Sequence, residues 1–291
     1  MIKKSNLISK IISVNKDELQ NNLKKYNNQI IVIKYGGSAM LDPNLSNSFF
    51  NDIKLIIDSG IKPIIVHGGG PQINSFLEKM NIKHKFHKGM RVTDKKTLLV
   101  VEMVLAGLIN KEISLKLALK GVNSLGISGC DSKLLMAKKL VIKQKDNIDL
   151  GYVGIPYRLN ANLISDLLSC KIIPIIAPIG FGAKGEKYNI NADITAGFIA
   201  HKLSARRLLM LTDVKGVINK NNSLIPELKL KEVNKLIADE VIYGGMIPKV
   251  NTCIEAVKKG VRASVIIDGR VKNALLKELF SAKGVGTLFR K

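Results

Sequence analysis

The sequence predicts an α/β protein with a mainly parallel central sheet covered by helices on both faces. Short β-branched runs alternate with helical segments along most of the 291 residues, and this alternation is typical of parallel sheets. Two of the runs, Gln29–Lys34 and Pro63–His67, end directly in glycine clusters. Ligands of parallel sheets bind beyond the carboxyl ends of the strands, so we expect the functional site at these glycines.

Residues 1–28 are expected to form a helical unit that stands apart from the rest. This stretch is a poor match to a secretory or mitochondrial leader, because it has no long apolar core and no arginine. Two interpretations remain open: a surface helix packed on the body, or a helix that pairs subunits. The apolar residues that recur at near-helical spacing are Ile8, Ile11, Ile12, Leu19 and Leu23.

From residue 29 the alternation predicts the remaining elements in order. Asp42 and Pro43 are typical of a helix start, and Gly151 and Gly154 are typical turn residues. We expect strands at 29–34, 63–67, 122–127, 171–177, 207–211 and 263–267. We expect helices at 42–60, 71–79, 94–120, 160–169, 193–203, 226–239, 246–259 and 273–280, with hairpins over 133–157.

The composition excludes several broad classes. With 46% hydrophobic and 24% charged residues, the chain can build a core, as one large domain or two small ones. Its apolar runs reach about 12 residues, whereas a membrane span needs roughly 20, so no membrane segment is expected. The three cysteines, Cys130, Cys170 and Cys253, have no CxxC spacing. We therefore expect no disulfide framework, no cysteine-based zinc site, and a reducing, cytoplasmic setting.

The charge balance is strongly basic, yet it does not favour nucleic acid as a partner. The 46 lysines and arginines exceed the 23 acidic residues by 23, and only seven of the 46 are arginine, which leaves 39 lysines. Proteins that read bases and phosphates favour arginine and aromatic stacking, whereas here aromatic residues make up 5% and tryptophan is absent. The surface is instead expected to attract anionic small substrates.

Four clusters carry the candidate chemistry: Lys34–Ser38, His67–Gly70, Asn189–Asp193 and Gly244–Lys249. Glycine pairs at a strand end let the backbone turn sharply and aim N–H groups at an anion. A single pair is more often a turn without a ligand, but three such loops, two of them with a lysine, favour a phosphate site. Asp193, near a helix start, is either a cap or a functional carboxylate.

Other phosphate and hydrolase signatures are missing or misplaced. No glycine is followed by lysine, which excludes a P-loop. Residues 180–185 match GxGxxG but lead into no helix, so a hairpin or loop is expected there rather than a dinucleotide site. The GxSxG of serine hydrolases is broken at Cys130. His84 and His87 have no clear carboxylate partner nearby and are expected on the surface rather than on a metal.

The order of these motifs resembles the amino-acid kinase family. The series KxGG, HGGG, RVT, NINAD, LTDVxGV, GGMIPKV and DGR extends from about residue 29 to the C-terminal end, and it is most similar to members that phosphorylate N-acetyl-L-glutamate. The resemblance implies an open αβα sandwich with two lobes. It assigns residues 29–203 to an N-lobe that binds the acyl amino acid and dimerises, residues 204–291 to an ATP-binding C-lobe, and residues 1–28 to an oligomerisation helix.

The implied reaction transfers the γ-phosphoryl group of ATP to the side-chain carboxylate of N-acetyl-L-glutamate. The product is N-acetyl-L-glutamyl 5-phosphate, and the reaction is the second step of arginine biosynthesis. The alternative is a sister kinase acting on N-acetylaminoadipate, whose extra methylene is worth only ~1–3 kcal/mol in a pocket. A nucleic-acid-binding or catalytically dead protein is disfavoured because Lys34, Lys249 and Asp193 are all present. Glutamate 5-kinase is disfavoured because no RNA-modification-like domain follows.

The resemblance also implies a role for each site residue. Lys34 and Lys249 would flank the transferring phosphoryl group as an electrostatic clamp, and Asp193 would hold both lysines. Mg²⁺ would be held mainly through ATP oxygens, so no dedicated metal ligands are expected. Acceptor binding is assigned to Gly69, Gly70, Arg91 and Asn189, and phosphate or nucleotide binding to Gly36, Gly37, Asp213, Val214, Gly216 and Val217.

Arginine-inhibited members of the family carry an N-terminal helix that interlaces dimers into a hexamer. The resemblance therefore implies L-arginine as a feedback inhibitor, bound beside that helix, and either a homodimer or a trimer of dimers. In the corresponding segment, Asp268–Glu278, this sequence has Asn273 and Lys277 where relatives often have histidine and an apolar residue. It retains Glu278.

Overall fold

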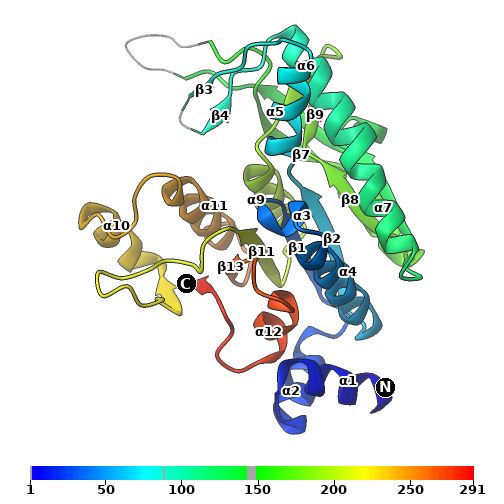
Figure 1. The fold of residues 1–291 in the computed structure, drawn as a ribbon, viewed down its shortest axis with the longest axis vertical. Helices are drawn as coiled ribbons and strands as arrows, with labels where there is room; N and C mark the ends of the chain where they lie inside the picture. The colour runs from blue at the N-terminus through cyan, green and yellow to red at the C-terminus, as the bar shows by residue number, and fades with distance from the viewer. Residues whose placement is uncertain (1, 88, 143–148) are drawn as a thin grey trace.

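The computed structural model describes residues 2–87, 89–142 and 149–291. Its centre is an eight-stranded sheet in the order β12-β14-β13-β11-β1-β2-β8-β5 (Figure 1). Every neighbouring pair in this sheet runs parallel except β13 and β14. The prediction of a mainly parallel sheet is therefore confirmed.

Three strands at the centre of the sheet position the functional site. β1 (Ile30–Tyr35) lies between β11 (Arg207–Thr212) and β2 (Lys62–His67). They are buried over almost their whole length, as their unbroken apolar runs predict. In the register of β1 with β2, Tyr35 stands beside His67. The two glycine loops therefore leave the sheet side by side.

The outer strands extend the sheet on both sides. β12 and β14 are absent from the sequence prediction, because runs of three and four residues carry little periodicity. The strands beyond β2 are β8 (Ile173–Ala177) and β5 (Ser124–Ser128), and those beyond β11 are β13 (Ser264–Asp268), β14 (Thr287–Arg290) and β12 (Glu227–Lys229).

Helices cover both faces of this sheet (Figure 1). On one face α4 (Pro43–Asp58) contacts α7 (Asn110–Ala118) and α12 (Ala274–Phe280), and on the other α9 (Ala192–Lys202) packs on α11 (Met246–Lys258). α9 also packs on β1, β2 and β11, which brings its first turn to the carboxyl end of β1. The remaining helices of the main body are α3 (Ser38–Leu41), α5 (Gly70–Lys79), α6 (Lys95–Glu102), α8 (Ala161–Ser169) and α10 (Leu230–Ala238).

A second, four-stranded sheet borders the site, in the order β10-β9-β6-β7. The hairpin or loop expected at 180–185 corresponds to the antiparallel pair of β9 and β10. Of the hairpins expected over 133–157, the described residues form the antiparallel pair of β6 and β7, and residues 143–148 lie outside the described residues. A two-stranded hairpin, β3 with β4, lies beside it (Figure 1). The strands are β6 (Leu135–Lys139), β7 (Gly154–Leu159), β9 (Ile179–Phe181), β10 (Lys187–Asn189), β3 (Phe86–His87) and β4 (Met90–Arg91).

Two helices differ from the sequence prediction. The helix expected at 94–120 is helical throughout, but Met103–Ile109 between α6 and α7 is a π-helix with a wider turn. The helix expected from residue 226 begins only at Leu230, because Glu227–Lys229 pairs with β14 as β12. In this second case tertiary pairing overrides the local pattern.

The N-terminal unit contains two helices rather than one. α1 (Ile2–Ile12) and α2 (Lys16–Tyr26) are separated at Asn15, whose side chain caps α2 by accepting the N–H of Glu18 at 2.7 Å. α2 packs against α12, and Asn22 Nδ2 donates to the carbonyl of Phe280 at 3.1 Å. The unit is therefore attached to the C-terminal part of the chain.

The predicted lobe boundary at residues 203 and 204 falls between α9 and β11. β1 and β11, from the two sides of that boundary, pair directly in one continuous sheet. The division into an acyl-amino-acid lobe and an ATP lobe stays a prediction. Among the described residues, no helix has the length and apolar character that crossing a membrane would require.

Candidate active site

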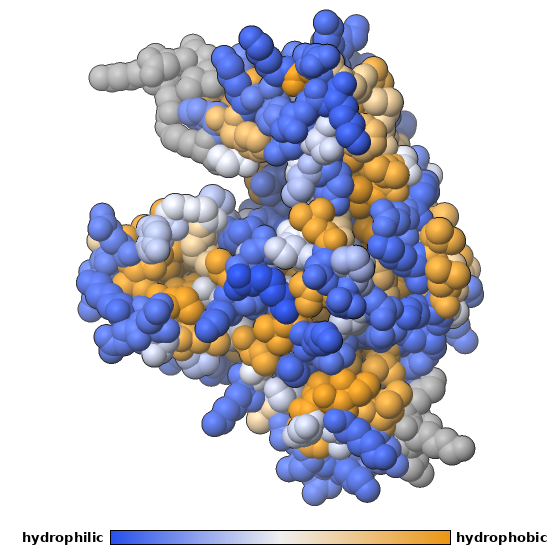
Figure 2. Space-filling model, in the orientation of Figure 1, coloured by the Kyte–Doolittle hydropathy of each residue, from blue (hydrophilic) through white to orange (hydrophobic). Residues whose placement is uncertain are grey.

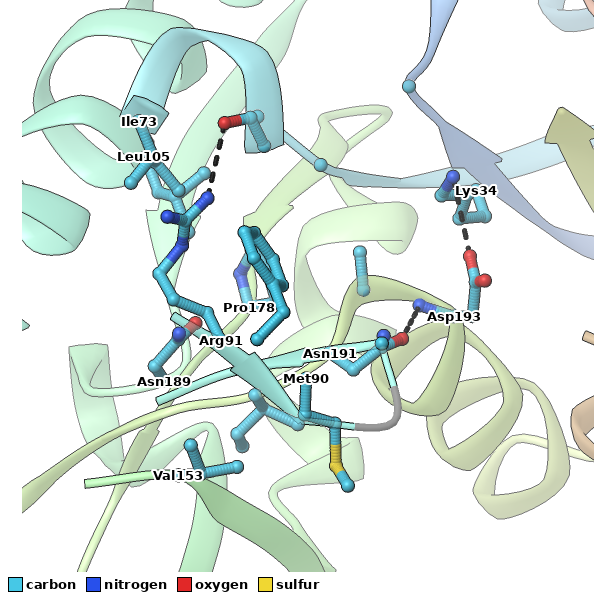
Figure 3. A pocket seen from close by; sticks show the side chains of 18 of the residues that line it. Lys34, Ile73, Met90, Arg91, Leu105, Val153, Pro178, Asn189, Asn191 and Asp193 are labelled. Carbon is cyan, nitrogen blue, oxygen red and sulfur yellow. Dashed lines mark hydrogen bonds and ion pairs between the residues drawn. The ribbon is translucent and has the colours of Figure 1, made fainter. Parts of the chain in front are cut away.

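A cavity of about 270 Å³ lies at the carboxyl ends of β1 and β2. Figure 3 shows Lys34 and Asp193 at one end of it and Arg91 at the other. The predicted site residues among its lining are Lys34, Gly36, Gly37, Gly69, Gly70, Arg91, Asn189, Asp193 and Lys249. We call this space the first cavity. It brings together residues from all four sequence clusters.

Asp193 stands between the two lysines. Its Oδ2 atom lies 2.9 Å from Lys249 Nζ, and its Oδ1 atom lies 3.3 Å from Lys34 Nζ. Burial opposes ionisation of this carboxyl, but the two ammonium groups outweigh burial and hold the pKa of Asp193 below its ordinary value. The three side chains therefore form a charged row with net charge +1 at the bottom of the cavity.

The sequence Asn-Ile-Asn-Ala-Asp explains how Asp193 is positioned. Asn191 caps α9, and its side-chain oxygen accepts the N–H groups of Asp193 and Ile194 at 2.8 and 3.3 Å. Asp193 itself lies in the first helical turn, where the helix dipole favours a negative charge. The alternative that Asp193 is only a cap is wrong, because Asn191 is the cap.

The loop after β1 turns at Gly37, whose φ of +67° favours glycine. A Cβ atom there would also stand only 2.7 Å from Asp213 Oδ1. The same oxygen accepts the N–H of Ser38 at 2.7 Å. Asp213, just after β11, therefore attaches the loop that follows β1.

Side chains pack closely against one side of the loop after β2, and its other side is free. A Cβ on Gly69 would stand 2.4 Å from Ile109 Cδ1 and 2.7 Å from Leu105 Cδ2. At Gly70, no described atom beyond its chain neighbours and its own helix backbone lies within 4 Å of a Cβ position. The backbone of this loop is therefore fixed from behind and accessible from the cavity, at the N-terminus of α5, where N–H groups attract anions.

Arg91, at the end of β4, is buried, and only some of its N–H donors have hydrogen-bond partners. Its Nη2 atom donates to Asn74 Oδ1 at 2.6 Å and to the carbonyl of Gly70 at 3.3 Å, and its guanidinium lies over the ring of Phe86. Its Nη1 atom is buried and has no hydrogen-bond partner in the described part of the chain. Burial lowers the pKa of Arg91 from its ordinary value. A free donor of this kind suits a carboxylate ligand.

Asn189, at the end of β10, is fixed by one hydrogen bond. Its Nδ2 atom donates to Thr93 Oγ1 at 3.0 Å, and Thr93 Oγ1 donates to the carbonyl of Arg91 at 2.8 Å. Asn189 and Arg91 are thus linked through Thr93, the last residue of the RVT motif. The two predicted acceptor-binding residues lie side by side along one wall.

A second cavity, of about 610 Å³, opens on the other side of Lys249. Of the predicted nucleotide residues, Val214, Gly216 and Val217 line it. Asp213 does not line it and instead binds Ser38, as described above. Sequence reasoning missed several other lining residues, namely Asn219, Lys220, Glu240 and Tyr243.

The surface is hollowed between the β3–β4 hairpin and α11 (Figure 2). This groove is lined by residues of α9 and α11 and also reaches Asp193 and Lys249. Lys249 borders the groove and both cavities. The charged row is therefore accessible from solvent and from two separate binding spaces.

The model of the amino acid kinase family matches residues 29–268. The chain belongs to the amino acid kinase family. The acetylglutamate kinase of Methylobacterium nodulans is 48% identical over 276 residues, which cover 92% of this chain and 91% of that protein. The acetylglutamate kinase of Rhizobium etli is 49% identical over 273 residues, which cover 91% of this chain and 92% of that protein.

Solved structures share the fold of this chain. A protein of Streptococcus mutans UA159 is 33% identical, with a TM-score of 0.75 over 90% of this chain and 98% of its own. N-acetylglutamate synthase from Neisseria gonorrhoeae, complexed with coenzyme A and N-acetyl-glutamate, has a TM-score of 0.84 at 22% identity; the match covers 94% of this chain and 62% of the synthase. Carbamate kinase from Giardia lamblia bound to AMP-PNP has a TM-score of 0.65 at 20% identity, over 91% of this chain and 99% of its own. These last two likenesses concern the fold.

The acidic side chains of this family member offer little to a metal ion. Among the described residues, no group of three or more His, Cys, Asp and Glu side chains is arranged to hold one. Within the described ranges, Asp193 is the one carboxylate that lines the first cavity, and each of its oxygens already faces a lysine. Glu240 is the one carboxylate of the described part of the chain that lines the second cavity. The donor set suits an anion more than a bare cation.

Sequence reasoning also missed the apolar wall of the first cavity, which is formed by Ile73, Phe86, Leu105, Val153 and Pro178. These residues come from five separate segments of the chain. No motif or periodicity connects them, so only the tertiary structure reveals that they share a wall. Figure 3 labels Ile73, Leu105, Val153 and Pro178 among the side chains that line the cavity.

Proposed function

We propose that this chain transfers the γ-phosphoryl group of ATP to the side-chain carboxylate of N-acetyl-L-glutamate. The product is N-acetyl-L-glutamyl 5-phosphate, in the second step of arginine biosynthesis. The observation that carries the proposal is the row Lys34, Asp193 and Lys249, which lines the first cavity and reaches the second through Lys249. Relatives named acetylglutamate kinase, identical at nearly half of the aligned positions, support the choice of acceptor.

The acceptor occupies the first cavity in this proposal. The free Nη1 of Arg91 binds its α-carboxylate, with Asn189 beside it. The side-chain carboxylate then points toward the Gly69–Gly70 backbone and Lys34, at the opposite end of the cavity. This carboxylate is ionised at neutral pH and attacks phosphorus directly, so the reaction needs no general base.

The two lysines supply the electrostatic part of the reaction. Phosphoryl transfer requires in-line positioning and neutralisation of charge on the transferring group. Lys34 reaches that group from β1, and Lys249 reaches it from α11 on the side of the leaving ADP. Asp193 orients both ammonium groups before the substrates bind, which lowers the reorganisation needed in the transition state.

The nucleotide occupies the second cavity, where Val214, Gly216 and Val217 border its binding space. The backbone of Gly36 and Gly37 faces its terminal phosphates from the first cavity. We propose that Mg²⁺ enters with ATP and is held through phosphate oxygens, which fits the small number of carboxylates lining both cavities. Asp213 contributes by holding the loop at Ser38.

The test is acyl-phosphate formation by the purified protein with ATP and Mg²⁺. N-acetyl-L-glutamate, L-glutamate and N-acetylaminoadipate are compared, with hydroxylamine trapping the product. We expect product with N-acetyl-L-glutamate alone. Faster reaction with N-acetylaminoadipate would assign the chain to a sister kinase, and no product with any acceptor would overturn the proposal.

A matched pair of variants checks the lysine clamp. Lys249→Ala is expected to lower kcat by about 10²-fold or more, the loss typical of one electrostatic donor. Lys258→Ala removes an exposed lysine of the same helix, which pairs with Glu255, and is expected to leave kcat unchanged. Equal activity of the two variants would remove Lys249 from the reaction.

We also propose that L-arginine inhibits the reaction by feedback. We place the protein in the cytoplasm, where reducing conditions suit its three free cysteines. Support for the feedback comes from Glu278, a partly buried carboxylate that accepts the N–H groups of Val285 and Gly286 at 2.8 and 3.2 Å. Burial raises its pKa, and the Arg207 guanidinium, stacked on Tyr26 of α2, lies near it. An arginine titration of the same assay tests this, and undiminished activity at millimolar arginine would contradict it.

An oligomer is proposed because of an exposed apolar surface. The α6–α7 segment exposes apolar side chains at Leu99, Leu115 and Leu119, in a region where Figure 2 shows apolar atoms gathered. Such a surface suits a second copy of the chain. α1 would then connect dimers. Light scattering is expected to give a hexamer for the full chain and a dimer after deletion of residues 1–14, and an unchanged mass would contradict the role of α1.

A further inference from the structure

His67, the last residue of β2, is fully buried directly before the glycine loop. Its Nδ1 atom lies 3.0 Å from the carbonyl oxygen of Gly68, and its Nε2 atom lies 3.1 Å from Asn110 Nδ2. Asn110, the first residue of α7, is also fully buried. The imidazole is therefore held between the loop and a helix that is distant in sequence.

The surroundings of Asn110 define the tautomer of His67. Asn110 Nδ2 donates to the carbonyl of Ile175 at 3.0 Å, and Asn110 Oδ1 accepts from Lys111 Nζ at 3.2 Å. The nitrogen of the amide therefore faces the imidazole. Because an amide nitrogen only donates, His67 Nε2 accepts, and the proton sits on Nδ1. His67 then donates to the carbonyl of Gly68.

Burial keeps this imidazole neutral. Burial, together with the nearby Lys111 ammonium, lowers the pKa of His67 to about 4, against the opposing hydrogen bond to Gly68. An imidazole with this pKa carries a single proton and no charge at neutral pH. His67 is thus suited to a fixed hydrogen-bonding role.

The π-helix contributes to the same contact. It spans Met103–Ile109 and ends immediately before Asn110. Two of its side chains, Leu105 and Ile109, press against Gly69 from behind. A wider helical turn brings these residues and Asn110 to one side, and such turns are frequent at functional sites. The segment and the adjoining Asn110 therefore contact the end of β2 at His67 and the loop at Gly69.

We propose that His67 and Asn110 are positioning residues that orient the Gly68–Gly70 backbone toward the acceptor carboxylate. The hydrogen bond to the Gly68 carbonyl directs that oxygen away from the cavity, which leaves the following N–H groups facing it. The loop also orients Arg91, because the carbonyl of Gly70 accepts from Arg91 Nη2. This inference rests on the proposed function, since it assigns the acceptor to the first cavity.

The kinetic test replaces the donor without changing its shape. Asn110→Asp turns the amide nitrogen into an oxygen and removes the donor that His67 Nε2 needs. We expect the KM for N-acetyl-L-glutamate to rise at least about tenfold, the cost of one lost buried hydrogen bond. The KM for ATP should change less than twofold, because the second cavity is built from other segments. Equal rises in both constants, or no rise, would overturn the proposal.

Two further variants separate positioning from a loss of folding. Ser114→Ala removes a neighbouring bond to the Asn110 backbone and is expected to leave both KM values unchanged. His67→Asn retains a donor near the Nδ1 position and should keep the acceptor KM within about threefold, whereas His67→Leu should raise it at least tenfold. Equal KM values for these two His67 variants would refute the inference.

A spectroscopic readout is independent of activity. Long-range ¹H–¹⁵N correlation spectra of the full-length wild-type protein distinguish the two neutral tautomers, and His67→Asn assigns the signal. We expect the Nδ1–H form from pH 6 to 8. The Nε2–H form, or a cation, would overturn the inference even in an active enzyme. If the wild type is inactive while the Nδ1–H form is present, the proposed function fails and the hydrogen-bond assignment stands.

Discussion

Lys249 Nζ lies 2.9 Å from Asp193 Oδ2, and this ion pair joins the first turns of α11 and α9. The two partners differ in exposure, because the Lys249 side chain is 25% exposed and that of Asp193 is 12% exposed. The carboxylate is therefore a buried anchor, whereas the ammonium group can contact a ligand. The pair connects the two sides of the predicted lobe boundary directly at the proposed reaction centre.

Asp193→Asn is expected to lower kcat by about 10²-fold while the fold is kept. An amide has the same shape but leaves Lys34 and Lys249 without their common counter-charge, and the preorganised clamp is lost. Steady-state kinetics and a thermal melt check this. If the variant retains wild-type kcat, the carboxylate does not orient the lysines.

Arg91→Lys is expected to raise the KM for N-acetyl-L-glutamate by about 10- to 100-fold, the equivalent of one charge-assisted hydrogen bond. Lysine keeps the charge but cannot present the planar pair of donors, one bound to Asn74 and one free. The KM for ATP should stay unchanged. A larger effect on ATP than on the acceptor would reverse the assignment of the two cavities.

Much of the fold follows from local patterns, whereas the walls of the site do not. Buried parallel strands appear as unbroken β-branched runs, so β1, β2 and β11 could be predicted. The π-helix could not, because the spacing of apolar residues over 94–120 fits a continuous α-helix equally well. A wider turn changes spacing by one residue, which the sequence pattern does not resolve.

In the site, too, some residues could be predicted from local patterns, whereas their tertiary contacts could not. Lys34 and Lys249 could be singled out because glycines surround them, and the structure brings both to Asp193. Asp213 has a contact that its motif did not indicate, since its carboxylate holds the N–H of Ser38. That bond joins positions 175 residues apart. A contact of this kind depends on the pairing of β1 with β11, and no local pattern contains it.

The wild-type protein should lose free energy of unfolding as the pH rises, and Asp52→Asn is expected to make this loss smaller. Asp52 is buried between α4 and α12, where its Oδ1 accepts from Asn273 Nδ2 at 2.9 Å. Burial raises its pKa from 3.8 to about 7, against the opposing bonds from Asn273 and the backbone of Leu275 and Leu276 and the charge of Lys277. The folded chain therefore binds this proton more tightly than the unfolded chain.

The sign follows from that difference. Between pH 4 and 7 the unfolded chain loses the Asp52 proton first, so stability falls as pH rises. A shift of about three pKa units corresponds to ~4 kcal/mol as an upper limit. Urea unfolding is compared at pH 5 and pH 8. The free energy of unfolding of the variant, relative to that of the wild type, should be higher at pH 8 than at pH 5. An identical pH dependence in both proteins would mean that Asp52 is already ionised in the folded state.

Gly151→Ala is expected to damage both stability and acceptor binding. Gly151 has a φ of +70°, and a Cβ there would stand 2.2 Å from the carbonyl oxygen of Thr93. The Thr93 backbone cannot move away easily, because its N–H donates to the carbonyl of Leu150 and its carbonyl accepts from the N–H of Tyr152. Since Thr93 binds Asn189, we expect a loss of ~1–3 kcal/mol in unfolding free energy together with a raised acceptor KM.

Gly185→Ala provides the control for backbone strain alone. Gly185 has a φ of +88° in the β9–β10 turn, and nothing lies within 4 Å of its Cβ position. This variant should lose about 1 kcal/mol through its backbone conformation, with both KM values unchanged. The difference between the two variants isolates the contact with Thr93. If Gly151→Ala lowers stability but leaves the acceptor KM at the wild-type value, the position of Thr93 does not influence acceptor binding.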